Sequence, residues 1–516
     1  MQFKASRRGF LQGMGGLAAA NVSSGCCSLC QPDNRIRLAA VGVMGKGFTD
    51  WLPMLKSGLV KMVAFCDCDY NKRDEAQKAL IRAKVDFDMY SVPFYTDYRK
   101  LLDDASRLGI QAMTVSTTDH THAPIAIQAM KQGIHVYVQK PLVRTLWELD
   151  YFKKTAKANK VVTQMGNQGS SLPGFRRGVE VLQSGILGEV KEVHVWTNRP
   201  VWPQGAKAAA GTTGKADGLP DGFNWNAWLS TAKDRPFKGK YAPGAKGYDP
   251  WNLCANVYHP FSWRGFFDFG CGAFGDMACH TMNLPFRGLE LGLCTRAELS
   301  LIEDVTDVAF PMKSTVKMTY AARQSAVQKG KTLPEVTLYW YDGCQKPSAD
   351  LMPEVVAAQG SVPNTGCVVL GTKGILCSTN DYGGDSFIAL KGEKKVVNIK
   401  DHPACKAIAH TIPYRSDSTA GQAVKSGAAA VSADGQYIEF LDAINGNGPV
   451  FRETGSRCYS DVDYSVPIME SILVGVAAQR VGKAGTVLNW DSANQKFDNA
   501  LANSFIKPYI RQGFEF

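Results

Sequence analysis

Three absences narrow what this sequence can encode. Beyond its N-terminal segment, the 516-residue chain has no uninterrupted apolar run long enough to cross a bilayer, so we predict no transmembrane span. Lys and Arg outnumber Asp and Glu by 58 to 47 but are scattered rather than clustered, which argues against nucleic-acid binding. The 14 cysteines include no CxxC pair repeated at zinc-ribbon spacing, so we predict no metal site. The remaining composition, 45% hydrophobic and 20% charged, is typical of a globular enzyme.

The N-terminus carries an export-type pattern. In "SRRGFLQGMGG" (residues 6–16), two adjacent arginines precede a Gly/Ala-rich, weakly apolar stretch, which resembles the twin-arginine leader of bacterial proteins exported already folded. We therefore assign residues 1–34 to a signal and linker, and expect the protein in the periplasm or lipid-anchored at the cell envelope of a bacterium. The sequence "SSGC" ending at Cys26 resembles a degraded lipobox, so Cys26 is either lipidated after cleavage or part of a spacer with free thiols.

Residues 35–166 alternate between apolar strand-like segments and helical segments. The segments that we expect to be strands are continuous apolar runs, as found where both faces of a sheet are covered. Strands and helices alternating at this length predict a doubly wound parallel sheet, an N-terminal Rossmann domain in an α/β protein. The expected strands are 35–43, 60–67, 110–116, 134–138 and 160–166, and the expected helices 71–84, 97–106 and 123–133.

Residues 167–516 have a different hydrophobic pattern. Segments 189–199, 314–322, 334–343 and 374–381 alternate apolar and polar residues, which predicts a mostly antiparallel sheet with one face buried. The stretch 200–290 is rich in Trp, Gly and Pro, and we expect long loops there, which at this density usually belong to a site.

The first strand ends in the glycine-rich "AVGVMGKGF". Against the G-x-G-x-x-G template, Gly42 and Gly47 match, Met44 takes the middle position, and Gly45 beside it is suited to restoring the close approach of a pyrophosphate to the helix N-terminus. An ordinary turn between a strand and a helix would look similar. Asp67, at the end of the second strand, favours a dinucleotide because a carboxylate there accepts hydrogen bonds from ribose hydroxyls and repels a 2′-phosphate. NAD is therefore predicted over NADP, with a cap for the following helix as the alternative role of Asp67.

Lys140 follows a buried strand, at the edge where doubly wound sheets bind ligands. Because it is held between that strand and Pro141, we expect it in the site rather than free in solvent. His120 and His122 form an H-x-H pair with no third metal ligand nearby, so we expect them on a loop lying against the cofactor.

Asp276 and His280 lie behind a glycine-rich stretch and are four residues apart, so on a helix they share one face. A lone histidine would most simply be a core residue. A histidine one turn after an aspartate is a better general-base candidate, because the carboxylate can hold its tautomer and raise its basicity.

Aromatic residues accumulate in the expected loops, where they either stack against sugar faces or form the core of the second domain. Arg199 and Arg264 stand among them, and we place both in the substrate pocket together with Trp202, Tyr258 and His259. The aromatic residues concerned are Trp196, Trp202, Trp225, Trp228, Trp251, Tyr258 and Trp263.

Together, the glycine-rich turn, "HVYVQKPL", "TQMGNQG", "WTNRPVWPQG" and "GDMACH" resemble the Gfo/Idh/MocA oxidoreductase family over nearly all of residues 35–516. The resemblance implies a Rossmann domain (35–166) and a second α/β domain (167–516) whose large open sheet, mostly antiparallel, covers the nicotinamide. It further implies hydride transfer between a sugar carbon and NAD(P), and association into a homo-oligomer.

By this resemblance, Lys140 matches the lysine of the family's Glu-Lys-Pro motif, beside nicotinamide and substrate hydroxyl. Asp276 and His280 match its aspartate and its proton-accepting histidine. Two residues depart from the pattern, because Gln139 replaces the usual Glu and Met44 replaces a glycine. The predicted cofactor-binding residues are Gly42, Met44, Gly45, Lys46, Gly47, Asp67, Ser116, Asp119, His122, Gln139, Lys140 and Gln168.

A twin-arginine leader on a dehydrogenase suggests that NAD is bound before export, because free NAD should be scarce outside the cytoplasm. A trapped cofactor requires a redox-neutral cycle, and the resemblance offers two: hydride transfer between sugars, as in glucose–fructose oxidoreductases, or the oxidation, elimination, hydration and reduction of NAD-dependent glycosidases. In the second, Lys140 or His280 serves the oxidation, and Asp276 or a loop tyrosine the elimination. A carbohydrate-binding protein on an inactive scaffold, and an ordinary cytoplasmic dehydrogenase, remain the alternatives.

Overall fold

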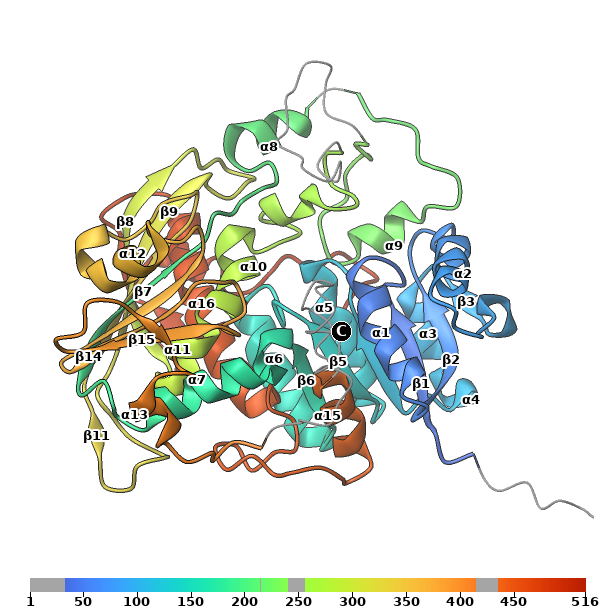
Figure 1. Ribbon diagram of the computed structural model, residues 1–516. Helices are drawn as coiled ribbons and strands as arrows, with labels where there is room; N and C mark the ends of the chain where they lie inside the picture. Colours follow the sequence, from blue (N-terminus) through green and yellow to red (C-terminus); the bar gives the residue numbers. More distant parts are fainter. Residues whose placement is uncertain (1–32, 214, 240–255, 414–434) are drawn as a thin grey trace, which may run out of the picture. The chain divides into compact units, whose positions relative to one another are not determined.

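The computed structural model describes residues 33–213, 215–239, 256–413 and 435–516 (Figure 1). Arg35–Phe516 form one compact unit. Nearly all of the predicted leader, including Cys26, falls outside the described residues, as does Trp251. Among the helices of the described ranges, none is both long and apolar enough to span a membrane.

Six parallel strands form the first sheet, in the order β3-β2-β1-β4-β5-β6. The order reverses between β1 and β4, which is the switch point where doubly wound sheets bind their ligands. The predicted doubly wound sheet is confirmed. Its strands are β1 (Ile36–Val41), β2 (Val60–Cys66), β3 (Phe94–Tyr95), β4 (Ala112–Val115), β5 (His135–Gln139) and β6 (Thr163–Gly166).

Both faces of this sheet are buried. Along β1, Leu38 and Ala40 belong to one hydrophobic cluster, whereas Ala39 and Val41 belong to another. Because successive side chains of a strand point to opposite faces, a strand covered on both sides must be apolar throughout, as the sequence is. The helices of this part are α1 (Lys46–Lys56), α2 (Lys72–Arg82), α3 (Tyr98–Asp103), α4 (Ala105–Leu108), α5 (Asp119–Lys131) and α6 (Leu146–Asn159). A later helix, α15 (Gly435–Ile444), packs against α1 on the face of the sheet to which Leu38 and Ala40 point.

Helix α5 begins four residues earlier than the sequence predicted, at Asp119 rather than residue 123. Pro124 lies inside the helix, and the turn before it is already helical. His120 and His122 therefore lie in the first turn of a helix and not on a loop, which corrects that expectation.

The second sheet has ten strands in the order β16-β15-β14-β13-β7-β12-β9-β8-β17-β18. Within this described sheet, β7 and β12 pair in parallel and the other neighbours pair antiparallel, so the predicted large and mostly antiparallel sheet is confirmed. Its strands are β7 (Val190–Trp196), β8 (Cys294–Glu303), β9 (Lys313–Tyr320), β12 (Val336–Tyr341), β13 (Gly366–Gly371), β14 (Gly374–Ser378), β15 (Ser386–Leu390), β16 (Val397–Asn398), β17 (Val487–Asp491) and β18 (Lys496–Phe497). A separate short pair comprises β10 (Arg323–Gln324) and β11 (Thr332–Leu333).

Helices connect the two sheets. The long helix α16 (Val462–Val481) contacts β8, α10 (Gly272–Thr281) and α6, and so joins the second sheet to the first. The predicted loop region 200–290 is partly helical: besides α10 it contains α8 (Gly205–Gly211), α9 (Trp225–Leu229) and α11 (Asn283–Gly288). The other helices are α7 (Pro173–Gln183), α12 (Pro353–Gln359), α13 (Pro403–Lys406) and α17 (Ala500–Asn503), with short 3-10 turns η1 (Met89–Ser91), η2 (Gln168–Ser171), η3 (Ser262–Gly265) and η4 (Ala349–Leu351).

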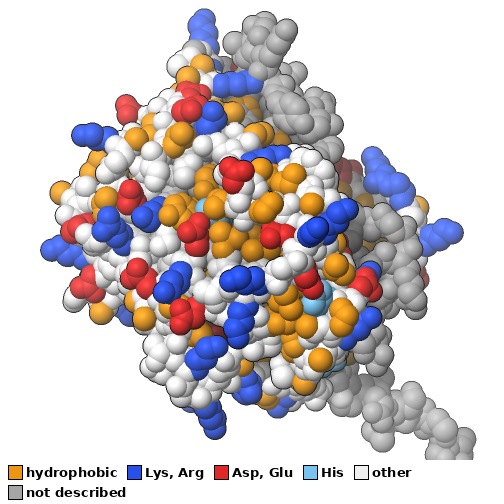
Figure 2. Space-filling view, turned by 60° about the vertical axis from the view of Figure 1, so that its left-hand side comes forward, with side chains coloured by type: hydrophobic (Ala, Val, Ile, Leu, Met, Phe, Trp, Pro, Cys, Tyr) orange, Lys and Arg blue, Asp and Glu red, His pale blue; other side chains and the backbone are white. Residues whose placement is uncertain are grey.

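The face seen in Figure 2 has Lys and Arg interspersed with Asp and Glu around scattered hydrophobic side chains. Charges of either sign do not gather into a single field on this face.

Candidate functional site

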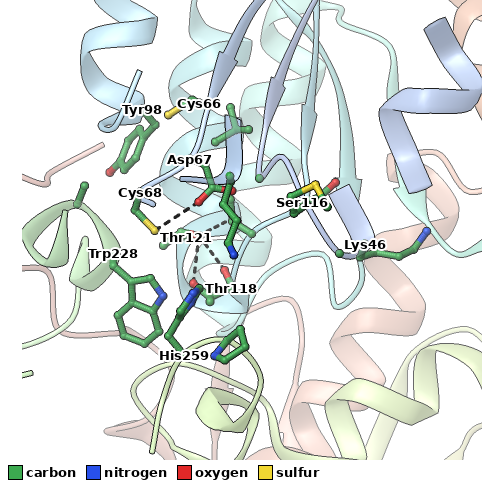
Figure 3. Close-up of a pocket in the computed structure, with 18 of the residues that line it drawn as sticks. Lys46, Cys66, Asp67, Cys68, Tyr98, Ser116, Thr118, Thr121, Trp228 and His259 are labelled. Carbon is green, nitrogen blue, oxygen red and sulfur yellow. Dashed lines mark hydrogen bonds between the residues drawn. The ribbon is translucent and has the colours of Figure 1, made fainter. Parts of the chain in front are cut away.

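A cavity of about 540 Å³ opens at the switch point of the first sheet (Figure 3). This volume falls in the range of small-molecule and cofactor sites. Figure 3 shows Trp228 and His259 on the opposite side of the cavity from Asp67. The turn after β1 contributes Gly42, Met44, Gly45 and Lys46. The ends of β2 and β4 contribute Cys66, Asp67, Cys68, Ser116 and Thr117, and the start of α5 contributes Thr118 and Thr121. Later segments contribute Ala227, Trp228, His259, Pro260, Phe261, Trp263 and Arg264.

The glycine-rich turn packs tightly against β4. Gly42 has φ +83°, and a Cβ added to it would lie 2.2 Å from the carbonyl oxygen of Ser116. A Cβ on Gly47 would lie 2.0 Å from the carbonyl oxygen of Gly42. Gly45 instead faces open space at the start of α1, where no side chain caps the helix amides. The two matching glycines therefore close the turn, and Gly45 leaves the helix N-terminus accessible, as a pyrophosphate requires.

Asp67 follows β2 and lines the cavity. Its carboxylate accepts hydrogen bonds from the backbone N–H of Val43 at 2.9 Å and of Asp69 at 3.1 Å, which ties the end of β2 to the glycine-rich turn. Burial raises the pKa of Asp67 to about 6. The N-cap of α2 is Asn71, so Asp67 does not cap that helix.

Residues 221–228, which we call the strap, cross from the second part of the chain to this end of the first sheet. Tyr70 N–H donates to the carbonyl of Gly222 at 3.0 Å, and Asn224 N–H donates to the carbonyl of Cys68 at 2.7 Å. The Asn224 side chain also donates to the carbonyl of Thr96 at 3.2 Å. These bonds seat Trp228 against the cavity, beside the residues that follow β2.

The segment that precedes α10 forms another wall of the cavity. The guanidinium of Arg264 lies 4.1 Å from the ring centre of Phe261 and 4.3 Å from that of Trp263. Arg264 Nε also donates to Asp276 Oδ1 at 3.3 Å. Arg264 lines the cavity and also contacts Asp276, so it links the cavity to the candidate catalytic residues.

Lys140, Asp276 and His280 come together beside the cavity. Lys140 Nζ donates to Asp276 Oδ1 and to the Asp276 carbonyl, both at 3.0 Å. Although burial alone would raise it, the pKa of Asp276 is lowered by the charges of Lys140 and Arg264. Burial, aided by the charge of Lys140, holds the pKa of His280 well below its ordinary value. At neutral pH this arrangement provides an ionised carboxylate and an uncharged imidazole, the latter able to accept a proton.

Several buried polar atoms near this group have no hydrogen-bond partner within the described residues. They are His280 Nδ1, Asn167 Nδ2 and Oδ1, and Gln168 Oε1. Asn167 and Gln168 follow β6, and the ring of His280 packs 4.8 Å from that of Tyr382, whose carbonyl contacts Gly169. Buried polar groups in proteins are nearly always hydrogen-bonded, so these atoms suit a ligand rich in hydroxyl or amide groups.

Six of the predicted cofactor residues line the cavity and six do not. Gly47 lies in the glycine-rich turn, and Lys140, Gln139 and Gln168 are not among the lining residues. The remaining two are buried against protein. Asp119 accepts from Cys271 N–H at 3.1 Å, and burial raises its pKa to about 7. The lining residues are Gly42, Met44, Gly45, Lys46, Asp67 and Ser116.

His120 and His122 both bond to backbone. His122 Nδ1 lies 2.8 Å from the Pro141 carbonyl oxygen and its Nε2 lies 3.2 Å from that of Thr117, while His120 Nε2 lies 3.0 Å from the carbonyl oxygen of Trp228. Burial lowers the pKa of His122 to about 4 and that of His120 to about 3. Both rings therefore pack within the protein around the cavity and do not line its wall. Within the described ranges, His, Cys, Asp and Glu form no cluster suited to a metal ion.

The candidate substrate residues divide into two groups. His259 and Arg264 line the cavity, and burial lowers the pKa of His259 to about 4. Arg199 donates to Asp381 at 2.9 Å, and Trp202 donates to Gln204 at 3.0 Å. Tyr258 packs in a buried aromatic cluster with Trp225, Trp228 and Trp263, so most of the loop aromatics form core, and Trp228 and Trp263 also face the cavity. Trp196 is buried on β7 in a different cluster.

Sequence reasoning missed three features of the site. Asn167 stands directly after β6, and its place at the carboxyl edge of the sheet was the available signal. Asp50 lies one helical turn after Lys46 and is fully buried, whereas an aspartate on a helix is ordinarily expected at the surface. The strap has no local signal, because its contacts join residues about 150 positions apart, as between Asn71 and Asp221.

Comparison with known proteins finds relatives that share parts of this sequence and solved structures that share its fold. Residues 36–167 match the family model described as "Oxidoreductase family, NAD-binding Rossmann fold". A stretch of 163 residues is 28% identical to "Glycosyl hydrolase family 109 protein 2" of Akkermansia muciniphila, covering 30% of this chain and 32% of that protein. A stretch of 160 residues is 25% identical to "Inositol 2-dehydrogenase" of Salmonella paratyphi B, covering 30% and 44%. The matches thus span less than half the length of these relatives.

The solved structure of an inositol dehydrogenase homolog from Azotobacter vinelandii, complexed with NADH and myo-inositol, shares the fold at 17% identity and a TM-score of 0.53, covering 89% of this chain and 98% of that one. The glycine-rich turn and the part of the cavity lining that comes from the first sheet lie inside the residues that the family model matches, whereas Trp228, His259 and Arg264 lie outside them. Residues 36–167 are therefore similar to the NAD-binding Rossmann part of the Gfo/Idh/MocA oxidoreductases.

Proposed function

We propose that the protein is an NAD-dependent oxidoreductase that acts on a ring hydroxyl of a sugar and recycles a tightly bound cofactor. The observation that carries the proposal is the contact of Lys140 with Asp276, one helical turn from the uncharged His280, immediately beyond the cavity wall. Relatives named as glycoside hydrolase and as inositol dehydrogenase both support a polyol or sugar substrate.

NAD fits the cavity residues. The glycine-rich turn and the uncapped start of α1 suit its pyrophosphate, and Asp67 suits a ribose diol while disfavouring a 2′-phosphate. When bound, NAD takes up a hydride from a ring carbon and can return it in the same turnover.

The site residues divide the proton chemistry. His280, held uncharged, accepts the proton of the ring hydroxyl, and Lys140 donates a hydrogen bond to the same oxygen. Asp276 is held ionised between two cations, so it orients Lys140 rather than removing a carbon-bound proton. Burial raises the pKa of Tyr382, so its phenol stays protonated beside His280 and suits donation to a departing oxygen.

The proposal is compatible with two redox-neutral net reactions, glycoside cleavage and hydride transfer between sugars, and incubation in D₂O distinguishes them. If glycosides are cleaved, the ketone formed at C3 acidifies the C2–H, and the aglycone leaves C1 with the proton of Tyr382 while the C2 proton passes through solvent back to Tyr382. Water then adds across C1 and C2, and return of the hydride and of the hydroxyl proton restores the C3 hydroxyl. Protein given aryl glycosides without added NAD should then release free sugar carrying deuterium at C2, read by mass spectrometry and NMR. Unlabelled sugar from direct hydrolysis would contradict the proposal, while a ketone, or turnover only with added NAD or a second sugar, would identify a plain or sugar–sugar oxidoreductase.

The strap supports cofactor retention, because its hydrogen bonds to the ends of β2 and β3 seat Trp228 against the cavity. In Trp228→Ala we expect NAD to dissociate at least about tenfold faster, since removal of a buried indole costs several kcal/mol of local packing. NAD per chain after gel filtration measures the effect.

Trp147→Ala is the matched control, because Trp147 packs on Tyr151 and Phe516 and does not line the cavity. Equal NAD retention in both variants would show that the strap does not hold the cofactor.

Export and self-association belong to the same proposal. A twin-arginine leader in residues 1–34 explains why a cofactor-loaded protein would fold before leaving the cytoplasm, and cell fractionation tests it. A homo-oligomer would pair through the second sheet, on which the ring of His194 stacks on that of Tyr339 at 4.9 Å, and light scattering tests for it.

A further inference from the structure

A fully buried carboxylate lies directly behind the cavity wall. Asp50, on α1, has no solvent exposure, yet four side chains from separate elements donate to it. Its Oδ1 lies 2.5 Å from Lys46 Nζ and 2.8 Å from Tyr437 Oη, and its Oδ2 lies 2.7 Å from Ser116 Oγ. Gln139 Nε2 donates to both oxygens, at 3.1 and 2.9 Å.

Every one of these partners is a donor to Asp50, so the site requires an acceptor with two oxygens. An isolated carboxylate buried this deeply would be strongly unfavourable, and the ammonium of Lys46 and the three neutral donors offset that cost. An amide at position 50 would turn an N–H toward one of these donors and leave that donor unpaired.

The same contacts fix the residue that precedes Lys140. With its amide nitrogen on Asp50, Gln139 turns its Oε1 to the backbone N–H of Lys140, at 3.3 Å. The amide fills the space beside Gly166, where an added Cβ would lie 2.4 Å from Gln139 Nε2. A glutamate side chain in place of Gln139 would set one buried carboxylate against another. The carboxylate of Asp50 therefore accounts for the amide that stands before the Lys-Pro pair.

Asp50 also orients the cavity wall. Ser116 and Lys46 both line the cavity. Because the Ser116 hydroxyl donates to Asp50, its oxygen lone pairs are left for a ligand, and because Lys46 is neutralised by Asp50, it brings no uncompensated positive charge to the cavity.

We propose that Asp50 is a positioning residue that couples the cofactor cavity to Lys140, through Ser116 and Lys46 on one side and Gln139 on the other. The role assigned to Lys140 rests on the proposed function, whereas the geometry of the cavity wall does not.

The test exchanges the carboxylate at position 50 and the amide at position 139. Asp50→Asn and Gln139→Glu should each speed NAD dissociation about tenfold or more and lower the midpoint of thermal unfolding by on the order of 5 °C. In the double variant, the new amide on α1 donates to the new carboxylate at the end of β5, which still accepts from Lys140 N–H. Dissociation should therefore be slower than in either single variant, yet faster than in the parent, because the new amide nitrogen also faces Ser116 or Lys46 and leaves that donor without its acceptor.

Glu148→Gln is the matched control, because Glu148 is a fully buried carboxylate that accepts from Arg144 and Thr145 N–H and does not line the cavity. It should lose thermal stability while retaining NAD as the parent does. The fluorescence of bound NADH, recorded on folded protein, reports the cavity wall without any substrate, so the result is independent of whether the sugar reaction is found. Single variants that match Glu148→Gln in NAD retention, or a double variant no better than the worse single, would overturn the proposal.

Discussion

Replacing Lys140 with methionine should nearly abolish turnover while leaving NAD bound. Lys140 Nζ contacts Asp276, and the side chain does not line the cavity. In the proposed function its ammonium serves the reacting hydroxyl and not cofactor binding. Methionine keeps a similar length and removes only the charge and its donors. We expect kcat to fall by roughly 10²–10⁴-fold, the range for a positioned proton-transfer or hydrogen-bonding group.

The pH dependence supplies a second signature of the same variant. Burial and the charge of Lys140 together hold the pKa of His280 below its ordinary value. Removing the cation takes away a group that disfavours the imidazolium, so the pKa of His280 should rise. The acidic limb of kcat/KM in Lys140→Met should therefore lie at higher pH than in the parent.

Lys238→Met is the control for losing a buried lysine, because Lys238 is also buried, donates to the carbonyl of Lys215 and does not line the cavity. It should keep kcat and its pH profile. If Lys140→Met retained most of the parent rate, or lost NAD on purification, the assignment of Lys140 to the reacting hydroxyl would be wrong.

The sequence was informative where a physical requirement acts locally. A strand buried on both faces must be apolar, so β1 and β5 were recognisable, and two groups four residues apart share a helix face, so Asp276 and His280 were found as a pair. Gly42 and Gly47 followed the same logic, since a side chain at either position would overlap backbone atoms of the turn or of Ser116.

What could not be predicted from the sequence depends on partners distant in the chain. Asp50 looks like an exposed helical residue beside Lys46 until Ser116, Gln139 and Tyr437 close around it. The loop tryptophans carry the same composition signal whether they face a sugar or a core, and only packing assigns Trp196 to the interior. The helix start at Asp119 was missed because the buried first turn of α5 carries polar side chains, which resemble a loop in the sequence.

Replacing Gly42 with alanine should both destabilise the protein and eject NAD. Two costs add at this position. The backbone has φ +83°, where a side chain is strained by roughly 1–2 kcal/mol. The new Cβ would also lie 2.2 Å from the carbonyl oxygen of Ser116, a backbone atom at the end of β4 that cannot rotate away. We expect a loss of roughly 2–5 kcal/mol in the free energy of unfolding.

Gly58→Ala separates the two costs. Gly58 follows α1 with φ +75°, nearly the same backbone conformation, but a Cβ there meets nothing within 4 Å. Its loss should be about 1 kcal/mol, with NAD retained. The difference between the variants measures the steric term at Gly42. Denaturant unfolding and NAD per chain provide both readouts, and equal values in the two variants would contradict the close contact of the turn with Ser116.

Relief of the overlap at Gly42 requires Ser116 to move, and Ser116 is held by Asp50. A shift of the β1 turn is therefore transmitted to the hydroxyl that lines the cavity and to the carboxylate that fixes Gln139. Cofactor loss in Gly42→Ala should consequently exceed what its loss of stability alone would produce, because the substitution displaces the pyrophosphate turn and disturbs the wall behind it in one step.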